Sequence, residues 1–286
     1  MYTPESTPLI MSTHPVTQNR SRARLQRGFS IVELMVGLTI GLFIVLAAVS
    51  SLVFTQATSS VVDDGARLQQ KADAIFRNIG YHISQAGAID LIPADDPGRV
   101  RFSISYPGFG VTASGVVANF AGTDGASNTP DTLSVSYEKT FDPDFPADRT
   151  RTISRDCLGN QPTGMQANVN NVFSLDTSTN DLMCLGAAAD TPAQSIANGV
   201  EDFQVLYGVQ TGVPGAENYR YFTASTVPDW AQIQAVRVCI QIIGDSNGNP
   251  KLSSLKLTGC RGQTLTNDNH LRRIFTRTFS VRNSLS

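Results

Sequence analysis

The chain has 286 residues, of which 41% are hydrophobic and 16% are charged, and its formal net charge is −2. This apolar fraction suffices for a folded core, which excludes a wholly disordered chain. The near-neutral charge argues against a broad nucleic-acid-binding surface, and three histidines leave little material for a His-rich metal site. The charge is uneven, however, because residues 1–28 carry a net +3 and the remainder carries −5.

The first strong signal along the chain is an apolar run from Phe29 to Phe54, whose one charged residue is Glu33. About 20 apolar residues cross a bilayer as a helix, so the run is long enough to span. Four arginines precede it and the next basic residue is Arg67, which predicts a cytoplasmic N-terminus. A secretory signal peptide has a shorter apolar region, with its cleavage site after that region. The run is therefore predicted to be a membrane anchor.

Residues 27–36 read RGFSIVELMV. In this stretch a basic residue is followed by a glycine and an aromatic residue, and a glutamate stands at the fifth position after the glycine. A carboxylate in a membrane helix costs about 2.5–3.5 kcal/mol at the helix centre and less near an end, so Glu33 is either solvated at the interface or paired with a partner's positive charge. The pattern resembles the class III signal of type IV pilins and type II secretion pseudopilins. This resemblance implies that a prepilin peptidase cuts between Gly28 and Phe29, that Phe29 becomes N-methylated, and that Glu33 pairs with the Phe29 amine of a neighbouring subunit.

Two features depart from the usual pilin pattern. The leader of residues 1–28 is long, and a start at Met11 would shorten it. Major pilins usually carry a proline about two-thirds along the membrane segment, but this chain has none between Pro15 and Pro93. The missing proline favours a minor pilin or a pseudopilin.

After Phe54 the sequence stays helical but becomes amphipathic, with Gly87 as the expected stop. One apolar stripe recurs at spacings of three and four residues: Leu68, Ala72, Ile75, Ile79, Ile83 and Ala86. From residue 100 onward, strand signals alternate with loops such as Gly122–Asp131 and Gly159–Asn171. The expected strands are Val100–Tyr106, Thr132–Glu138, Thr150–Ser154, Val172–Leu175, Phe203–Tyr207, Tyr219–Thr223, Ile233–Ile243 and Ile274–Val281.

These signals predict an α+β fold, in which a long N-terminal helix, first transmembrane and then amphipathic, packs on an antiparallel β-sheet. That is also the pilin architecture. The expected parts are a prepilin leader (1–28), a transmembrane half-helix (29–54), an amphipathic half-helix (55–87) and a β-rich periplasmic or extracellular domain (88–286). Four stretches in order, at 131–137, 157–160, 200–208 and 230–238, resemble the PilW group of minor pilins and its J-type pseudopilin relatives. Trp230 in the last stretch is expected to anchor the core.

The four cysteines lie beyond the predicted span, where an oxidising periplasm favours two disulfides. Four cysteines allow three connectivities. We favour Cys157 with Cys184 and Cys239 with Cys260, because each pair closes a local loop between neighbouring expected strands. Each loop contributes about 3 kcal/mol in the chain-entropy model. The spacings do not match a redox or zinc motif.

Two enzyme signatures are missing: the sequence has no phosphate-binding glycine loop and no His-Glu-x-x-His. The turn that begins at Asp245 lacks the final glutamate of a calcium loop. A basic stretch near the C-terminus is expected to be the solvated face of a strand: Arg272, Arg273, Arg277 and Arg282.

The sequence is therefore expected to encode a non-catalytic minor pilin without cofactor or metal, which initiates or caps a type IV pilus. The alternatives are a J-type minor pseudopilin of a type II secretion system, or a tip subunit that binds a surface or DNA. An exposed Trp230 would favour a binding role, and a cleft joining His270 to carboxylates would favour an enzyme. The implied partners are prepilin peptidase, other minor pilins, the major pilin, the assembly platform and the inner membrane, and nucleic acid is not expected among them.

Overall fold

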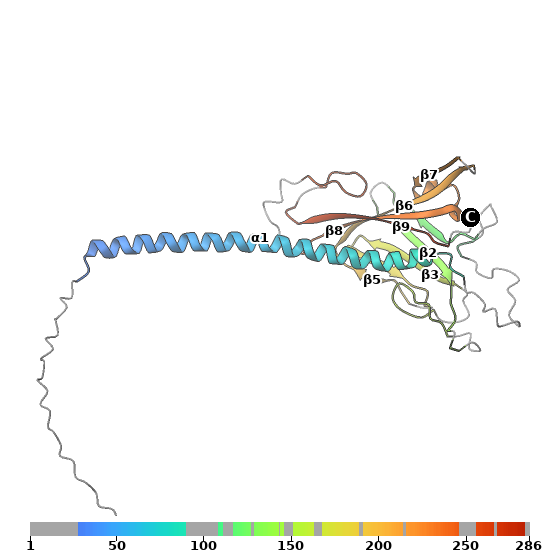
Figure 1. Ribbon diagram of the computed structural model, residues 1–286, viewed down its shortest axis with the longest axis horizontal. Helices are drawn as coiled ribbons and strands as arrows, with labels where there is room; N and C mark the ends of the chain where they lie inside the picture. Colours follow the sequence, from blue (N-terminus) through green and yellow to red (C-terminus); the bar gives the residue numbers. More distant parts are fainter. Residues whose placement is uncertain are drawn as a thin grey trace, which may run out of the picture. The chain divides into compact units, whose positions relative to one another are not determined.

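The computed structural model of the chain describes residues 28–89, 108–110, 117–126, 129–142, 144–145, 151–162, 168–188, 191–213, 216–245, 256–265 and 268–283 (Figure 1). The expected leader up to residue 27 and the expected strand Val100–Tyr106 lie outside these residues. The chain divides into two compact units, residues 1–53 and 54–286. The first contains the apolar part of the long helix, and the second contains its amphipathic part together with all the strands.

Helix α1 spans Ile31–Gln85, close to the predicted bounds. It ends because Gly87 adopts a left-handed conformation (φ +73°), which glycine tolerates without steric cost. The Gly87 amide then donates to the Ser136 carbonyl at 3.0 Å, so the chain leaving the helix runs onto a strand. The Asn283 side-chain amide donates to the carbonyl of Ala86 at 3.3 Å, which satisfies one of the unpaired groups at the helix end.

The strands form two antiparallel sheets rather than the single sheet that the sequence predicted. The five-stranded sheet follows chain order and consists of β1 (Phe120–Thr123), β2 (Thr132–Glu138), β3 (Asn168–Asp176), β4 (Asp181–Leu185) and β5 (Gln194–Ala197). The four-stranded sheet has the order β7-β6-β8-β9, with β6 at Val200–Val213, β7 at Ala216–Phe222, β8 at Ile233–Ile243 and β9 at Arg272–Ser280. Two short 3₁₀ helices, η1 (Ala224–Thr226) and η2 (Trp230–Gln232), lead into β8.

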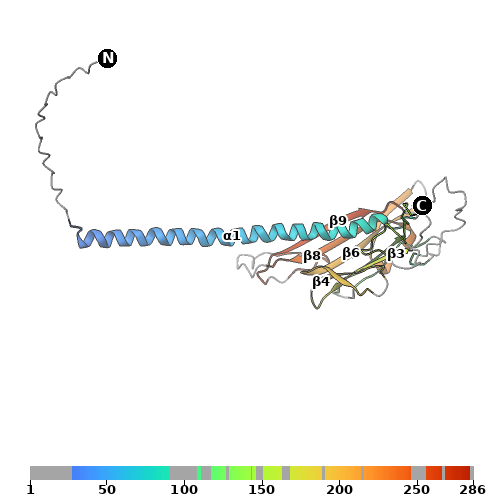
Figure 2. The ribbon, with the colours of Figure 1, turned by 90° about the horizontal axis from the view of Figure 1, so that it is seen from below.

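The amphipathic part of α1 shares one core with both sheets. All six residues of the predicted helical stripe are buried, and Phe76 joins them. Figures 1 and 2 both show this part of the helix lying along the strands. A side chain at position 80 would collide with the Phe279 ring of β9, so Gly80 lets helix and strand approach closely. The Phe76 and Phe279 rings then pack with centroids 6.1 Å apart.

Several strand predictions need correction. Strands β1, β4 and β5 were not expected. Strand β1 begins at Phe120 and runs into the expected loop Gly122–Asp131, and β3 begins at Asn168, inside the expected loop Gly159–Asn171. Three asparagines made the start of β3 look like a loop, but Asn171 is fully buried and its side-chain oxygen accepts from the Cys157 amide at 2.7 Å. The expected strand at 150–154 contributes an isolated bridge between Thr152 and Phe141 in the described part of the chain.

Candidate functional site

The predicted processing site lies directly before α1. Gly28, Phe29 and Ser30 precede the helix, and the Leu34 amide donates to the Ser30 carbonyl at 3.1 Å, which begins the helix. A side-chain carbon added to Gly28 would meet no heavy atom within 4 Å. The fold itself therefore places no size limit on position 28, so any requirement for a small residue there comes from a processing enzyme.

Glu33 lies in the first turn of α1, and its side chain is exposed. The positive end of the helix dipole stabilises a carboxylate at this position by about 0.3–1 kcal/mol. That is less than the cost of carrying an unpaired carboxylate into a bilayer. Within the described residues no basic side chain pairs with Glu33. The carboxylate thus remains available to a cationic group from outside this chain.

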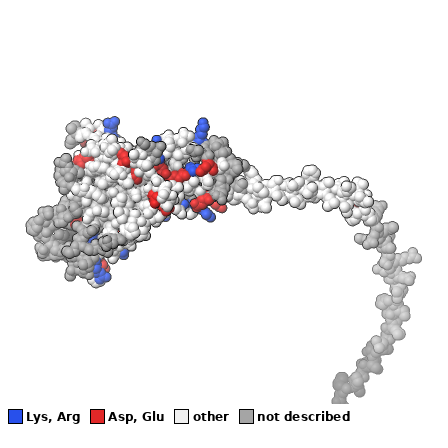
Figure 3. Space-filling view, turned by 180° about the vertical axis from the view of Figure 1, so that it is seen from behind, with Lys and Arg blue, Asp and Glu red and all other residues white. Residues whose placement is uncertain are grey.

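The apolar part of α1, residues 31–54, has its side chains exposed along its whole length, up to 80% for Ile31. It is long and apolar enough to cross a membrane. On the face shown in Figure 3 it carries no charged side chain. Its hydroxyl groups are satisfied internally, since Thr39 donates to the Val36 carbonyl at 2.9 Å and Ser50 to the Leu46 carbonyl at 2.8 Å. This surface is suited to lipid or to other apolar helices.

The structure pairs the four cysteines in the favoured connectivity. Cys157 and Cys184 lie in the core, with Cα atoms 6.3 Å apart, and join the turn before β3 to β4. Cys239 and Cys260 have Cα atoms 5.8 Å apart and fasten the segment around residue 260 onto β8. Each bond thus holds a long connection against a sheet.

Asp131, just before β2, joins the two sheets. Strand β7 pairs with β6 only from Tyr207 onward, so the first half of β6 has an open edge. The Asp131 amide donates to the Phe203 carbonyl at 2.8 Å, and the Asp131 carboxylate accepts from the Val205 amide, also at 2.8 Å. The second carboxylate oxygen accepts from the Gly125 amide at 3.0 Å. One residue therefore closes the edge of β6 and fixes the loop between β1 and β2.

Asp124 anchors the same loop to η1. Its carboxylate oxygens accept from the Ala224 amide at 2.6 Å and the Ser225 amide at 2.8 Å. Partial burial acts to raise the pKa of Asp124, but these hydrogen bonds and those from neighbouring hydroxyls outweigh it and lower the pKa. Burial raises the pKa of Asp131, against the opposing effect of its two amide donors. The two carboxylates stand at one end of a groove.

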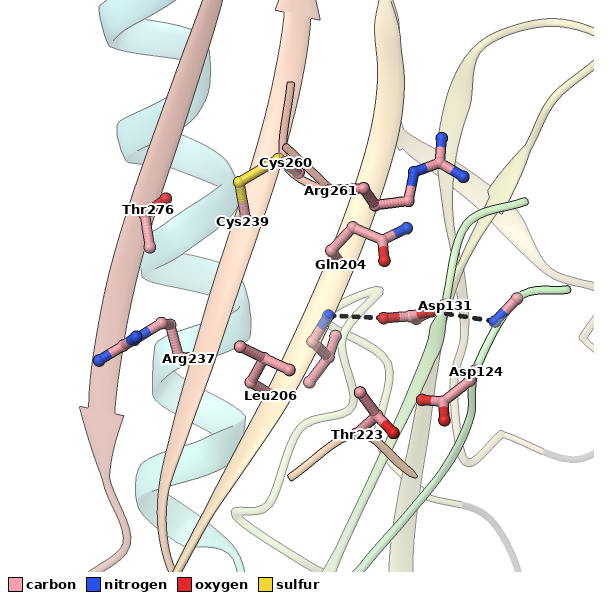
Figure 4. A pocket seen from close by; sticks show the side chains of 12 residues that line it. Asp124, Asp131, Gln204, Leu206, Thr223, Arg237, Cys239, Cys260, Arg261 and Thr276 are labelled. Carbon is pink, nitrogen blue, oxygen red and sulfur yellow. Dashed lines mark hydrogen bonds between the residues drawn. A yellow bond between two sulfur atoms is a disulfide. The ribbon is translucent and has the colours of Figure 1, made fainter. Parts of the chain in front are cut away.

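The groove has a volume of about 550 Å³ and runs over the outer face of the four-stranded sheet (Figure 4). Its floor is formed by Gln204 and Leu206 of β6 and by the disulfide between Cys239 and Cys260, and Arg237 and Arg261 also line it. In Figure 4, α1 lies behind the strands, on the opposite side of the sheet. The groove was not predicted from the sequence.

Two of the four basic residues near the C-terminus, Arg272 and Arg277, are engaged by carboxylates of the protein itself. Arg272 contacts Glu201 through two hydrogen bonds, at 2.7 and 2.9 Å, and also pairs with Asp268, and these carboxylates raise the pKa of Arg272. Arg277 pairs with Asp73 of α1 at 3.0 Å. On the face shown in Figure 3 the basic side chains stand apart, with acidic ones among them. His270 contacts Asp268 at 3.3 Å within the same ionic group.

His82 is a buried polar residue near the end of α1. It is 3% exposed, and its Nδ1 atom lies 3.1 Å from the Tyr137 hydroxyl. That hydroxyl donates to the Arg155 carbonyl at 2.7 Å, so Nδ1 must carry the proton and donate to the tyrosine oxygen. Burial lowers the pKa of His82 from 6.5 to about 4, although the charge of Asp156 opposes the shift. The imidazole is therefore neutral at pH 7.

We expect His82 to make the stability of the protein depend on acidity. A histidine with a depressed folded-state pKa takes up a proton on unfolding, so the free energy of unfolding should fall as pH drops from 6.5 to about 4. The full loss is about 3 kcal/mol, at 1.36 kcal/mol per pKa unit. Urea unfolding of the full chain in detergent between pH 4 and 7 measures it. The His82→Gln variant should lose most of this slope, and an equal slope in both proteins would contradict the assignment.

Two family models match the chain. The model of type IV pilus-assembly protein W matches residues 165–283, which include β3 to β9, and the prokaryotic N-terminal methylation motif matches residues 23–49, which include Gly28, Phe29 and Glu33. These matches support a PilW-type minor pilin. Its long helix packed on antiparallel sheets is the α+β architecture expected from the sequence. The methylation motif implies processing by a prepilin peptidase and a role in pilus assembly.

One solved structure, a type IV-like pilin from Thermus thermophilus, is similar with a TM-score of 0.41 and 11% identity, over 76% of this chain and 96% of that one. A search of curated proteins finds no match. The sequence predicted the processing residues, which stay a prediction, and the cysteine pairing, which the structure confirms. It gave no sign of Asp124, Asp131 and the groove, since these come together across the two sheets.

Proposed function

We propose that this PilW-type pilin is a non-catalytic subunit of the complex that primes, or stays at the tip of, a type IV pilus. One observation carries the proposal: the long helix and its adjoining residues expose apolar side chains from Phe29 to Phe54 and bury an apolar stripe from Leu68 to Ala86. The first part needs lipid or other apolar helices, and the second is already covered by the sheets. A subunit built in this way can move from a membrane into a bundle of similar helices.

The first turn of α1 supports a specific assembly contact. A peptidase cut between Gly28 and Phe29 creates a new amino terminus four residues before Glu33. Methylation leaves that amine basic, so it is positively charged at pH 7. When two such subunits pack with offset helices, the Glu33 carboxylate of one meets the amine of the other, which removes the cost of an unpaired charge in an apolar environment. The partners are then other minor pilins and the major pilin.

The proposed topology follows the charges around the membrane segment. The arginines before Phe29 favour a cytoplasmic N-terminus at the inner membrane, and the head, defined as residues 88–286, then faces the periplasm. Both disulfides belong to the head and persist in that oxidising compartment. Assembly would carry the head onward to the tip of the pilus and the cell surface.

Size and helix composition favour the tip over the shaft. Subunits in a shaft stagger closely along their helices, and a large head with long loops crowds the subunits above and below it. A tip position removes this constraint on one side. The absence of proline between Pro15 and Pro93 leaves α1 without the usual cause of a sharp bend.

The remaining candidates are a J-type pseudopilin and a tip subunit that binds a surface or DNA. An exposed tryptophan would have favoured a binding role, but Trp230 packs edge-on against the buried Tyr207, with ring centroids 4.8 Å apart. Arg272 and Arg277 are likewise occupied by carboxylates of the chain itself. These contacts support a structural role.

Deletion of the gene separates a pilus from a secretion apparatus. We expect the deletion strain to lose surface pili, as counted by electron microscopy, and to secrete its type II substrates at the normal level. Re-expression of the intact chain should restore the pili, which provides the control for effects on neighbouring genes. Loss of secretion with normal pili would instead identify a pseudopilin.

A further inference from the structure

The outer face of the four-stranded sheet carries a set of exposed side chains that the fold does not require. The inner face of β6 and β8 packs on the core, where Val205 and Val238 are almost completely buried. The alternate residues point outward and include Leu206 and Arg237. Helix α1 lies on the inner side of the sheet, so the outer face is free of the protein's own helix (Figure 4).

Strand β7 adds two exposed aromatic residues to this face. Tyr219 and Tyr221 are 70% and 39% exposed and, being two residues apart on a strand, share one side. The Arg237 guanidinium lies 3.8 Å from the centroid of the Tyr221 ring and donates to the Thr278 hydroxyl at 3.4 Å, so the pair is held in place before any partner arrives. Tyrosine and arginine are enriched among the residues that contribute most to protein–protein binding.

Tyr219 stands on an arm that extends beyond the sheet, whereas Tyr221 lies opposite Gly208, where β8 still pairs with β6. Strand β8 pairs with β6 only as far as the contact between Ile233 and Val209. The following residues of β6 pair with β7 alone, up to Val213 opposite Ala216. A two-stranded ribbon is marginally stable in water by itself, so contact with a further surface would stabilise it.

The groove beside the arm has an acidic end without a matching cation. Its two arginines are engaged, Arg237 with Tyr221 and Arg261 with the buried carboxylate of Asp202 at 3.1 Å. Within the described residues, the Asp131 carboxylate accepts hydrogen bonds from backbone amides, and the Asp124 carboxylate accepts them from backbone amides and neighbouring hydroxyls. Neither carboxylate forms a salt bridge with a described residue. Each oxygen keeps a lone pair that can accept another donor.

We propose that this outer face, defined as Tyr219, Tyr221, Arg237 and the groove, docks the head of another pilin subunit, which places a lysine or arginine side chain between Asp124 and Asp131. The charge of the acidic end selects a basic group, and the rigid tyrosine–arginine pair supplies the surrounding contact area. The occupant is a pilin head because the proposed function, on which this inference rests, brings such heads side by side above their helices. The inner face cannot serve, since α1 and the core already cover it.

Crosslinking in cells tests the proposed contact directly. A photoreactive phenylalanine analogue replaces Tyr219 in the full chain, and a matched position, Leu185 of the other sheet, which is 42% exposed, serves as control. We expect a crosslinked product from position 219 and at least fivefold less from position 185. Mass spectrometry should find an N-methylated phenylalanine peptide of a second pilin in that product. A product that contains no second pilin, or equal yields at both positions, would overturn the proposal.

Charge reversal tests the acidic end. The tagged full chain is co-expressed with the other pilins, and the amount of each that co-purifies in detergent is measured. Both Asp124→Lys and Tyr221→Ala should reduce one partner about tenfold, whereas Leu185→Ala should not. Leader removal and both disulfides, checked by mass, should be unchanged in all variants. Normal recovery of every partner with Asp124→Lys and with Tyr221→Ala would refute the surface, while loss of pili in the deletion strain would still support the proposed function.

Discussion

Replacing Gly28 with leucine should leave the protein in its full-length form when it is co-expressed with a prepilin peptidase. The unaltered chain should lose residues 1–28 and gain a methylated Phe29. The physical basis is local, because a side chain at position 28 would contact nothing in the fold. Loss of cleavage would therefore report the peptidase's need for a small residue and not a misfolded substrate. Intact-mass measurement of the membrane fraction distinguishes the two forms.

A second glycine provides the matched control for this experiment. Gly37 belongs to the same apolar segment, and its surroundings are equally open. Gly37→Leu should therefore be cleaved and methylated like the unaltered chain. If the unaltered protein itself retained residues 1–28 in membrane or pilus fractions, the assignment of the processing site would be wrong.

The Glu33→Val variant should insert and be processed normally but fail to assemble. Removing the carboxylate lowers the cost of membrane insertion by up to about 3 kcal/mol, so insertion is not at risk. Assembly loses the one charge that can meet a partner's Phe29 amine. Co-purification of other minor pilins in detergent should fall about tenfold, the ratio expected for a loss of about 1.4 kcal/mol.

The charge and the hydrogen-bonding capacity of Glu33 can be separated. Glu33→Gln keeps an acceptor oxygen of similar reach but carries no charge, so it should assemble nearly as poorly as Glu33→Val if the contact is ionic. Full recovery of partner pilins with Glu33→Val would show that Glu33 is not an assembly contact. Recovery with Glu33→Gln alone would show that the contact is a neutral hydrogen bond.

The parts of the fold with strong periodicity were predictable from sequence. The stripe from Leu68 to Ala86 specified the buried side of α1, and the alternation in β8 specified its bounds, Ile233–Ile243, to the residue. Strands β1 and β5 have four residues each and too few apolar side chains to show any period. The division into two sheets also depends on where β6 changes partner, which is a tertiary property.

The candidate sites divide in the same way. Gly28, Phe29 and Glu33 are recognisable because the motif is contiguous along the chain. Asp131 is not, because its partner Val205 lies 74 residues away and an aspartate before a strand usually indicates only a turn. Contacts of this kind, made by backbone amides from distant segments, leave no pattern in a single sequence.

Antibody labelling of sheared pili tests the central claim most directly. Gold particles attached to an antibody against the head, defined above as residues 88–286, would be located by electron microscopy. The proposed role predicts few particles for each pilus, at one end of the fibre, with the remaining protein in the membrane fraction. Dense labelling along the whole shaft would identify a bulk fibre subunit and contradict the argument from head size.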